Sequence, residues 1–569
     1  MDEEEYLERL RRLWLEHWPP GAARELSYPQ GEVPLAEYLR AWARQDPDRP
    51  AVIFYGKTLS YRDLDRRSDR FAALLAEQGI GPGDRVAVFM PNCPQFHIAF
   101  FGILKCGAVH APVSPMSKAF ELGYQLKDSG AKAIVALDQL MPLVREVRAE
   151  TDVNQVFVTS LAEVVPEKPT VPVPDIAQAP RADVSDAIDL FPALEACMAP
   201  APEVSPGLDD VAALNYTGGT TGMPKGCVHT HRDMLYTAAA SQATGMPLSP
   251  DSVLVCFFPE FWIAGENTAL LFPTFAGSTV VLLARWDPVA FMTAVQRYRA
   301  TVAGLLVDNA VELMEHPRAG EFELRSLRQV RGVSFVKKLT VDYRRRWREW
   351  TGTTIAEAAW GMTETHTSDT FTTGMQEDDF DLKSQPIFVG LPVPGTEFKI
   401  CDFETGELLP LGSEGEFCVR TPSLLKGYWN KPEETAKALR QGWLHTGDVG
   451  MLDEQGFLHF LGRRKEMLKV NGMSVFPAEI EAILGRHPAV VGSGVVGAPD
   501  PERGQQPVAF IVLDPESGRG LTESALQRWC REHMAVYKVP RIHIVDSLPL
   551  TATGKVRKTE LEARVVEER

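Results

Sequence analysis

Residues 216–226 read Tyr216-Thr217-Gly218-Gly219-Thr220-Thr221-Gly222-Met223-Pro224-Lys225-Gly226, and this stretch decides how the chain is interpreted. Its glycines allow successive backbone N–H groups to turn toward one anion, and its threonines add hydroxyl donors. It is not the Walker sequence, because Lys225 follows a proline and is not followed by serine or threonine. The stretch predicts a phosphate-binding loop formed by Thr217, Gly218, Gly219, Thr220, Thr221, Gly222 and Lys225.

Short apolar strands alternate with helices on both sides of this loop. We expect helices at Phe96–Lys105 and Glu121–Asp128. The expected strands are Arg85–Met90, Ala108–Val113, Ala133–Leu137, Ala212–Tyr216, Val253–Phe257, Thr279–Leu283, Val302–Leu306 and Thr354–Ala358. Such alternation is typical of parallel sheets covered by helices on both faces, which indicates the α/β class.

Three segments differ from this pattern. Apolar residues recur at helical spacing from Tyr6 to Trp18, and we expect this first helix to pack on its own domain. The stretch Pro166–Gly207 predicts a long surface insertion with one short helix near Ile188–Cys197. Beyond about Gly462 a small α+β domain is expected. Its helices are Pro477–Leu484 and Glu523–His533, and its strands are Val490–Val496 and Val508–Leu513.

Composition excludes several classes of partner. The 569 residues carry a formal net charge of -17, which disfavours nucleic acid and anionic lipid as default partners. The acidic start Met1–Glu5 lacks the features of a secretory signal, and no stretch is long and apolar enough for a transmembrane helix. The eight scattered cysteines are expected to be reduced thiols. We therefore expect a cytoplasmic protein and leave peripheral membrane contact and a homodimer open.

Four further motifs follow the glycine-rich loop in order. They are Trp360-Gly361-Met362-Thr363-Glu364, then Trp443-Leu444-His445-Thr446-Gly447-Asp448, then Gly462-Arg463-Arg464-Lys465-Glu466 with Lys469-Val470-Asn471-Gly472, and finally Leu548-Pro549-Leu550-Thr551-Ala552-Thr553-Gly554-Lys555. A reacting phosphate group needs its charge neutralised by a metal ion and by donors. Glu364 and Lys555 supply the residue types that this chemistry requires.

Together with the loop, these motifs strongly resemble those of the adenylate-forming superfamily, which includes acyl-CoA synthetases, luciferases and peptide-synthetase adenylation domains. In appearance the chain is most similar to medium- and long-chain fatty acid–CoA ligases. Gly218 stands where the family usually has a second serine, a mild departure. The resemblance implies a large N-terminal domain of β/α layers, residues 1–464, and a small mobile α+β C-terminal domain, residues 465–569.

The resemblance also implies roles for individual residues. Lys555, Thr217 and Glu364 would be catalytic, and Glu364 and Thr217 would bind Mg²⁺. Trp360 would stack on adenine, Thr363 would contact the α-phosphate, and Asp448 and Arg463 would bind the ribose. Lys465 would be the hinge between the domains, and Gly472 would border the tunnel for the pantetheine thiol. The ATP site would be completed by Gly361 and Met362.

The implied reaction has two steps. A carboxylate attacks the α-phosphate of Mg·ATP and forms acyl-AMP and pyrophosphate. The thiol of coenzyme A then attacks the acyl-AMP and forms a thioester and AMP. A medium- or long-chain fatty acid is the expected acid, with an aryl or polar acid as the alternative.

The acid-binding side departs from the family pattern. The usual histidine segment reads Pro259-Glu260-Phe261-Trp262, and Trp262 is expected to line or gate the acyl pocket. Gly332 begins the usual pocket wall, but the family proline is missing and Lys337 and Lys338 follow. These lysines, with Asp308, put a long apolar tunnel in doubt. The basic run Tyr343–Arg348 is expected to be a solvated helix face, with contact to coenzyme A phosphates as the alternative.

Other functions remain open at this point. An amide-forming adenylate ligase would share every ATP motif and differ only in the acceptor. An amino-acid-activating domain usually carries an aspartate where Trp262 falls. A non-catalytic binding protein would be expected to have lost Lys555 or Glu364, and both are present.

Overall fold

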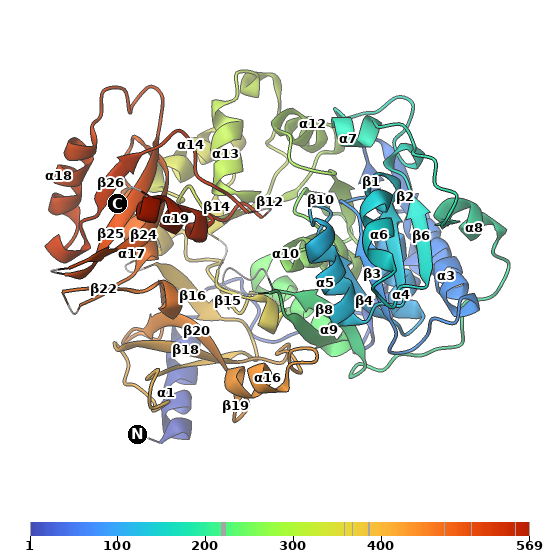
Figure 1. The fold of residues 1–569 in the computed structure, drawn as a ribbon, viewed down its shortest axis with the longest axis horizontal. Helices are drawn as coiled ribbons and strands as arrows, with labels where there is room; N and C mark the ends of the chain where they lie inside the picture. The colour runs from blue at the N-terminus through green and yellow to red at the C-terminus, as the bar shows by residue number, and fades with distance from the viewer. Residues whose placement is uncertain are drawn as a thin grey trace.

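Two parallel sheets form the larger part of the molecule (Figure 1). The computed structural model describes residues 2–217, 223–357, 359–366, 368–384, 387–471, 473–501, 503–551 and 553–567. The first sheet has the strand order β14 (Ile355–Glu357), β13 (Gln329–Val333), β12 (Val302–Leu306), β10 (Val253–Cys256), β11 (Thr279–Leu282), β1 (Pro50–Phe54) and β2 (Lys57–Ser60). The second has the order β7 (Ile188–Asp189), β6 (Gln155–Thr159), β5 (Ala133–Leu137), β3 (Arg85–Phe89), β4 (Val109–Val113), β8 (Val211–Tyr216) and β9 (Gly226–Thr230). Only β2 and β9 run antiparallel to their neighbours.

Helices cover both faces of the second sheet, as predicted. Val86 and Val88 of β3 pack in the same core as α3 (Tyr61–Glu77) and α4 (Pro94–Lys105). The intervening residues, Ala87 and Phe89, pack in a separate core with α5 (Ala119–Ser129) and α6 (Met141–Arg148). Successive side chains of a strand point to opposite faces, so a strand buried on both sides needs a continuous apolar run.

The remaining helices of the two parallel layers follow the chain order. They are α2 (Leu35–Gln45), α7 (Asp175–Gln178), α8 (Leu190–Ala196), α9 (His231–Ala240), α10 (Ile263–Glu266), α11 (Phe272–Ala276), α12 (Pro288–Tyr298), α13 (Val307–Glu315) and α14 (Val341–Thr351). The helices and strands expected in this region form at the predicted places, with ends that differ by at most a few residues.

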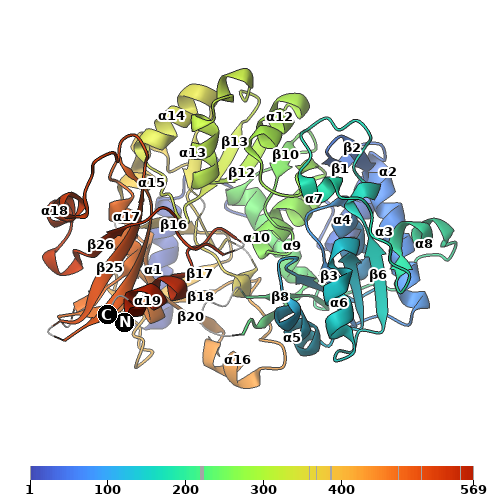
Figure 2. The ribbon, with the colours of Figure 1, turned by 45° about the horizontal axis from the view of Figure 1, so that its top comes forward.

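A third, antiparallel sheet was not predicted from the sequence. Its order is β15 (Thr370–Phe371), β16 (Phe388–Pro392), β21 (Leu458–Arg463), β20 (Trp443–Leu452), β18 (Glu414–Arg420) and β17 (Glu397–Cys401), with β19 (Leu439–Arg440) beside β20. Two short helices, α15 (Phe380–Lys383) and α16 (Pro432–Ala438), lie in its connections. This sheet links the parallel layers to the C-terminal unit (Figure 2).

The first helix, α1 (Glu3–Glu16), packs on this third sheet rather than on its neighbours in sequence (Figures 1 and 2). Its residues Tyr6, Leu10 and Trp14 are buried in the sheet's core. The Trp14 indole N–H donates to the Gly456 carbonyl at 2.9 Å, across 442 residues of sequence. The apolar face of this helix is therefore covered by protein, as expected.

The C-terminal unit has the expected α+β composition. Its sheet orders β23 (Met473–Val475), β22 (Leu468–Val470), β25 (Gly504–Leu513) and β24 (Val490–Asp500), and β26 (Arg541–Ile544) pairs in parallel with β25. The helices are α17 (Pro477–Leu484), α18 (Glu523–His533) and α19 (Lys558–Glu567). The predicted α/β class with a small α+β C-terminal domain is therefore confirmed.

The insertion Pro166–Gly207 is less separate from the fold than expected. Its predicted helix is present as α8, but β7 also extends the second sheet by pairing with β6. Leu190 and Leu194 of α8 are buried in the main core. The proline-rich composition concealed this anchoring, because two apolar residues one helical turn apart are a weak signal.

The prediction of a solvated helix face for Tyr343–Arg348 was wrong for Arg344. Arg345 and Arg346 are at least partly exposed and pair with nearby acidic residues, but the Arg344 side chain is only 1% exposed. Its guanidinium makes two hydrogen bonds of 2.7 Å to Asp381, and one of 2.9 Å to Asp379. A buried guanidinium needs such partners, since an unpaired charge in the interior is costly.

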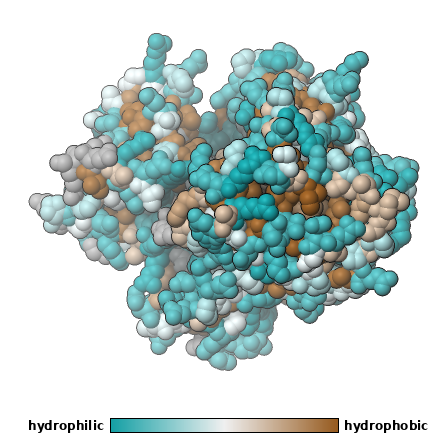
Figure 3. Space-filling model, turned by 45° about the vertical axis from the view of Figure 1, so that its right-hand side comes forward, coloured by the Kyte–Doolittle hydropathy of each residue, from teal (hydrophilic) through white to brown (hydrophobic). Residues whose placement is uncertain are grey.

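Other observations agree with the sequence. All eight cysteines are buried free thiols. No helix in the described part of the chain combines the length and the hydropathy needed to cross a membrane. Hydrophilic residues cover most of the face in Figure 3, and the surface is hollowed between its left-hand lobe and the larger body.

Replacing Arg344 by methionine should destabilise the part of the molecule formed by the two parallel sheets and their helices, to which α14 belongs. The change leaves the buried Asp381 carboxylate without its partner, which costs about 3–5 kcal/mol of unfolding free energy. The control is Arg345→Met, whose ion pairs with Asp342 and Glu349 are exposed to water and therefore contribute little. Urea unfolding of the two variants measures the difference, and equal midpoints would contradict a structural role for the Arg344–Asp381 pair.

Candidate active site

The base of the glycine-rich loop is held by a pair of hydrogen bonds. The loop joins the antiparallel strands β8 and β9, which pair Tyr216 with Gly226. The Thr217 N–H donates to the Lys225 carbonyl at 2.9 Å, and the Lys225 N–H donates to the Thr217 hydroxyl oxygen at 3.2 Å. Five of the predicted loop residues, Gly218, Gly219, Thr220, Thr221 and Gly222, lie outside the described residues. The two ends of the loop thus hold the Thr217 hydroxyl against the backbone of Lys225.

The Trp360–Glu364 motif lies beside this loop. Thr363 and Glu364 form a short turn, and the Glu364 carboxylate accepts a hydrogen bond of 2.8 Å from the Tyr428 hydroxyl. The Lys225 ammonium lies 4.0 Å from the centre of the Tyr428 ring. Tyr428 was not singled out from the sequence, where only the aromatic pair Tyr428-Trp429 after a glycine marks it.

Three predicted residues meet on the other side of the site. The Trp360 indole N–H donates to the Asp448 carboxylate at 2.9 Å, and Arg463 Nε lies 3.1 Å from the other Asp448 oxygen. Asp448 and Arg463 are direct neighbours across β20 and β21. Burial raises the pKa of Asp448, and the Arg463 charge opposes that rise. Trp360 is itself buried against Phe398 and Phe417, and its stacking on adenine remains a prediction.

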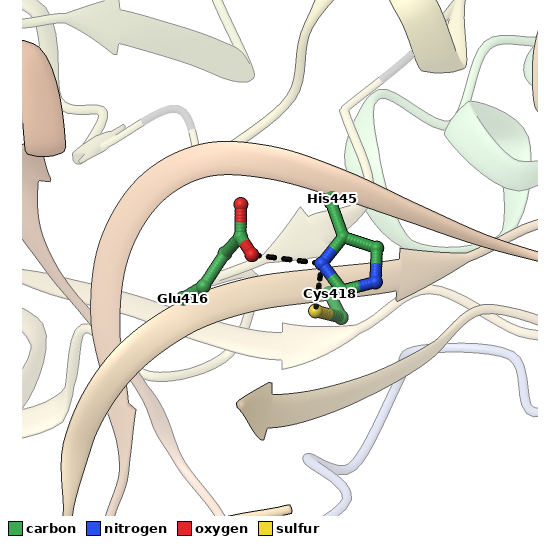
Figure 4. Close-up of side chains that lie close together, drawn as sticks. All are labelled: Glu416, Cys418 and His445. Carbon is green, nitrogen blue, oxygen red and sulfur yellow. Dashed lines mark hydrogen bonds and ion pairs between the residues drawn. The ribbon is translucent and has the colours of Figure 1, made fainter. Parts of the chain in front are cut away.

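A buried polar group orders the turn that carries Asp448 (Figure 4). One Glu416 oxygen accepts the Gly447 N–H at 3.0 Å, and the other lies 2.8 Å from His445 Nδ1. The Cys418 sulfur lies 3.4 Å from the same nitrogen. The ligand atoms of these three residues lie within 4.8 Å of one another, a spacing that a metal ion accepts. Both Glu416 oxygens already contact the turn, one at the Gly447 N–H and the other at His445. We therefore interpret Glu416, Cys418 and His445 as structural support for the turn that carries Asp448.

Lys555 reaches this region from the far end of the chain. Its loop is closed by hydrogen bonds between Thr551 and Lys555, and Gly554 packs so closely that an added Cβ would lie 3.0 Å from Leu306. The Lys555 ammonium lies 5.2 Å from the centre of the Phe335 ring. The surrounding protein and then the Arg463 charge lower the pKa of Lys555, while Asp448, Glu466 and Glu364 raise it. The lysine is therefore within electrostatic range of the Asp448 and Glu364 carboxylates.

The predicted hinge lies where the chain passes from the third sheet to the fourth. Lys465 is in a short turn, Arg464–Glu466, between β21 and β22. Glu466 pairs with Lys558 at 2.9 Å, and Lys558 also pairs with Glu481 at 3.1 Å. Burial and the Arg463 charge lower the pKa of Lys465. Gly472, the predicted tunnel residue, lies outside the described residues.

The acid-binding side combines aromatic and polar residues. The Trp262 ring lies 6.2 Å from the rings of Phe258 and Phe335, centre to centre. The strand partner of Gly332 is Glu357, which was not predicted, and burial raises the pKa of its carboxyl to about 7. Glu357 accepts hydrogen bonds of 3.0 Å from the backbone and the hydroxyl of Ser334.

The remaining predicted residues on this side have structural contacts. Gly332 lies in β13, where an added Cβ would be 2.7 Å from Ile355, so close packing of the two strands requires glycine. Asp308 accepts the Lys337 backbone N–H, and the Lys338 ammonium donates to the Phe335 carbonyl at 3.0 Å. These polar groups therefore hold the backbone around Phe335.

Comparisons with known proteins agree with this arrangement. Family models of the AMP-binding enzyme and of its C-terminal domain match residues 39–429 and 479–555. A long-chain-fatty-acid–CoA ligase of Bacillus subtilis (strain 168) is 32% identical over 96% of this chain and 97% of its own. A 4-coumarate-CoA ligase 1 of Narcissus pseudonarcissus is also 32% identical, over 95% of each chain.

Among solved structures, ATP-bound MatB from Rhodopseudomonas palustris aligns with a TM-score of 0.78 and 28% identity, covering 93% of this chain and 98% of its own. These matches confirm the predicted enzyme class, an AMP-forming acyl-CoA synthetase. Both the order of the motifs and the fold are those of the matched family, and the chain therefore belongs to the AMP-binding enzyme family.

Proposed function

We propose that the protein joins a medium- or long-chain fatty acid to coenzyme A through an acyl-adenylate. One observation carries the proposal: the Lys555 ammonium lies 5.2 Å from the centre of the Phe335 ring, and the Trp262 ring lies 6.2 Å from the same ring, centre to centre. A lysine in that position can stabilise the negative charge that builds up as a carboxylate attacks the α-phosphate. Once formed, the acyl-adenylate would lose AMP to the thiol of coenzyme A.

In this proposal the ATP site uses residues from three parts of the chain. Lys225 and the loop residues would bind the phosphates, and Thr363 would contact the α-phosphate. Asp448 and Arg463 would bind the ribose beside Trp360. The Glu364 carboxylate and the Thr217 hydroxyl are hard oxygen donors, which fit Mg²⁺. When bound, Mg²⁺ would neutralise phosphate charge.

The acid is proposed from two sources of support. The Bacillus subtilis relative is named as a long-chain-fatty-acid–CoA ligase, and the rings of Trp262, Phe258 and Phe335 offer contact area to a hydrocarbon. The second candidate is an aryl or polar acid. Glu357 favours that candidate, because it is a buried polar group: burial raises the pKa of its carboxyl to about 7, and it accepts a hydrogen bond from the Ser334 hydroxyl. The 4-coumarate–CoA ligase relative favours it too. An amide-forming reaction would differ only in the acceptor.

The proposal also covers the organisation of the enzyme. We place the domain boundary after residue 464 and the pivot at Lys465, since the third sheet ends at Arg463 and the fourth begins at Leu468. The buried free thiols fit a cytoplasmic enzyme. A homodimer and peripheral membrane contact stay open.

Lys555→Ala should mainly impair adenylation. Loss of a charge-stabilising donor lowers the rate of acyl-AMP formation by about 10²–10³ or more. Reaction of supplied acyl-AMP with coenzyme A should suffer much less, and pyrophosphate release and thioester mass measure the two steps. The control is Arg557→Ala, which removes an exposed cation two residues away. Equal losses in both steps would reject the role assigned to Lys555.

Lys465→Pro should separate the two half-reactions. In this proposal Lys555 acts at the nucleotide site and Gly472 borders the path of the thiol, so the C-terminal domain must reorient between the steps. Proline restricts φ at the pivot, so pyrophosphate release should survive and thioester formation should fall. Lys465→Ala, which removes the amine but leaves φ free, is the control. Unchanged thioester turnover in the proline variant would count against this hinge.

A series of acids from acetate to palmitate should identify the acyl pocket. Each buried methylene adds about 0.8 kcal/mol, roughly fourfold in kcat/KM, until the pocket is full. A rise with chain length supports a fatty acid. Best activity on acetate, or activity only on an aromatic or polar acid, would refute the fatty-acid proposal and leave the adenylate chemistry intact.

A further inference from the structure

Residues 424–430, between β18 and α16, join the two motifs that surround the ATP phosphates. The Leu425 N–H donates to the Glu364 carbonyl at 2.8 Å. On the other side, Lys426 and Gly427 exchange hydrogen bonds with Val228, and the Trp429 N–H donates to the Gly226 carbonyl at 2.8 Å. This segment therefore lies antiparallel to β9, with Tyr428 opposite Cys227, while it also holds the Glu364 turn.

Tyr428 is the side chain of this segment that reaches both motifs. It is buried, and its hydroxyl donates to the Glu364 Oε1 atom at 2.8 Å. Its ring face lies 4.0 Å from the Lys225 ammonium. Burial and the Glu364 charge raise the pKa of the phenol, so it remains a neutral donor. A neutral donor orients a carboxylate without cancelling its charge.

The contacts of the Tyr428 backbone hold the ring in this place. The Tyr428 N–H donates to the Thr435 hydroxyl oxygen of α16 at 2.9 Å. Gly427 has φ +151, and a Cβ there would lie 3.1 Å from the Thr435 methyl group. Glu434 lies 3.8 Å from the Lys225 ammonium, and its side chain is 46% exposed. Water weakens that ion pair. The cation–π contact with the buried Tyr428 ring therefore does more to fix the position of the Lys225 ammonium.

We propose that Tyr428 is a positioning residue that aims the Glu364 carboxylate at the metal ion and the Lys225 ammonium at the phosphates. The inference rests on the proposed function, because that function assigns those roles to Glu364 and Lys225. Hydrogen bonds to a metal-binding carboxylate fix its orientation, and their loss weakens metal binding. One tyrosine thus couples the metal site to the phosphate site through its hydroxyl and its ring.

Three variants of the full-length chain separate this role from ordinary core packing. Tyr428→Phe removes the hydroxyl and keeps the ring for Lys225. Tyr428→Met removes both and fills a similar volume. Tyr236→Phe is the matched control, since Tyr236 is a buried tyrosine of the same core whose hydroxyl bonds to Pro394 and Thr396 rather than to Glu364. Thermal unfolding checks that each variant is folded.

The readout is ATP binding by titration calorimetry without acid or coenzyme A. One titration is made in excess EDTA, and a separate set is made without EDTA over a series of Mg²⁺ concentrations. For Tyr428→Phe we expect the ATP affinity in EDTA to be unchanged. The Mg²⁺ concentration that gives half of the maximal change in ATP affinity should rise about tenfold or more. For Tyr428→Met we expect a lower ATP affinity in EDTA and also a higher Mg²⁺ requirement. For Tyr236→Phe we expect neither quantity to change. If Tyr428→Phe does not fold, the methionine variant carries the test alone.

Two results would overturn the inference. One is an unchanged Mg²⁺ requirement in the folded Tyr428 variants, and the other is wild-type ATP binding that does not respond to Mg²⁺. The binding assay contains no acid, so it does not depend on which acid the enzyme uses. The proposed reaction is tested separately, and it would be refuted if no acid gave pyrophosphate release.

Discussion

The pairing of Asp448 with Arg463 across β20 and β21 constrains much of the rest of the molecule. A buried carboxylate needs a partner, so Arg463 is held to the large body by a charge that cannot be left unpaired. The chain continues to the C-terminal unit directly after this residue. Any reorientation of that unit must therefore begin beyond Arg463, in the short turn Arg464–Glu466. The interaction that would form part of the proposed nucleotide site thus also favours the position that we propose for the hinge.

The sequence predicted those parts of the fold that local pattern determines. The run from Val86 to Phe89 is apolar because both faces of β3 are covered, and the loop after Tyr216 could be recognised from its glycines and threonines alone. The antiparallel third sheet was missed, because its strands are interrupted by turns and its core is completed by α1 from the other end of the chain. Arg344 was misread for a similar reason, since Asp379 and Asp381 lie 35 and 37 residues away.

Much the same division holds for the candidate site. Thr217, Lys225, Glu364, Asp448, Arg463 and Lys555 could be named from motifs. Tyr428, Glu416 and Glu357 could not, because each acts on a residue that tertiary structure alone brings near. On the acid-binding side the local pattern gave no clear answer, and the structure shows why. Phe335 is shared: it faces Trp262, lies beneath the Lys555 ammonium, and is held through its carbonyl by Lys338. In the proposed reaction, selection of the acid and placement of Lys555 would therefore depend on the same short segment.

The docking of α1 has a consequence for how the protein is made. Trp14 emerges from the ribosome 442 residues before its partner Gly456. At about 5–20 residues per second, this corresponds to roughly 20–90 s of synthesis. During much of that interval the face formed by Tyr6, Leu10 and Trp14 lacks the third-sheet strands that cover it in the folded protein. The helix that closes the third sheet is thus synthesised long before the strands that bury it, and its apolar face is a natural early binding site for a chaperone that shields apolar surface.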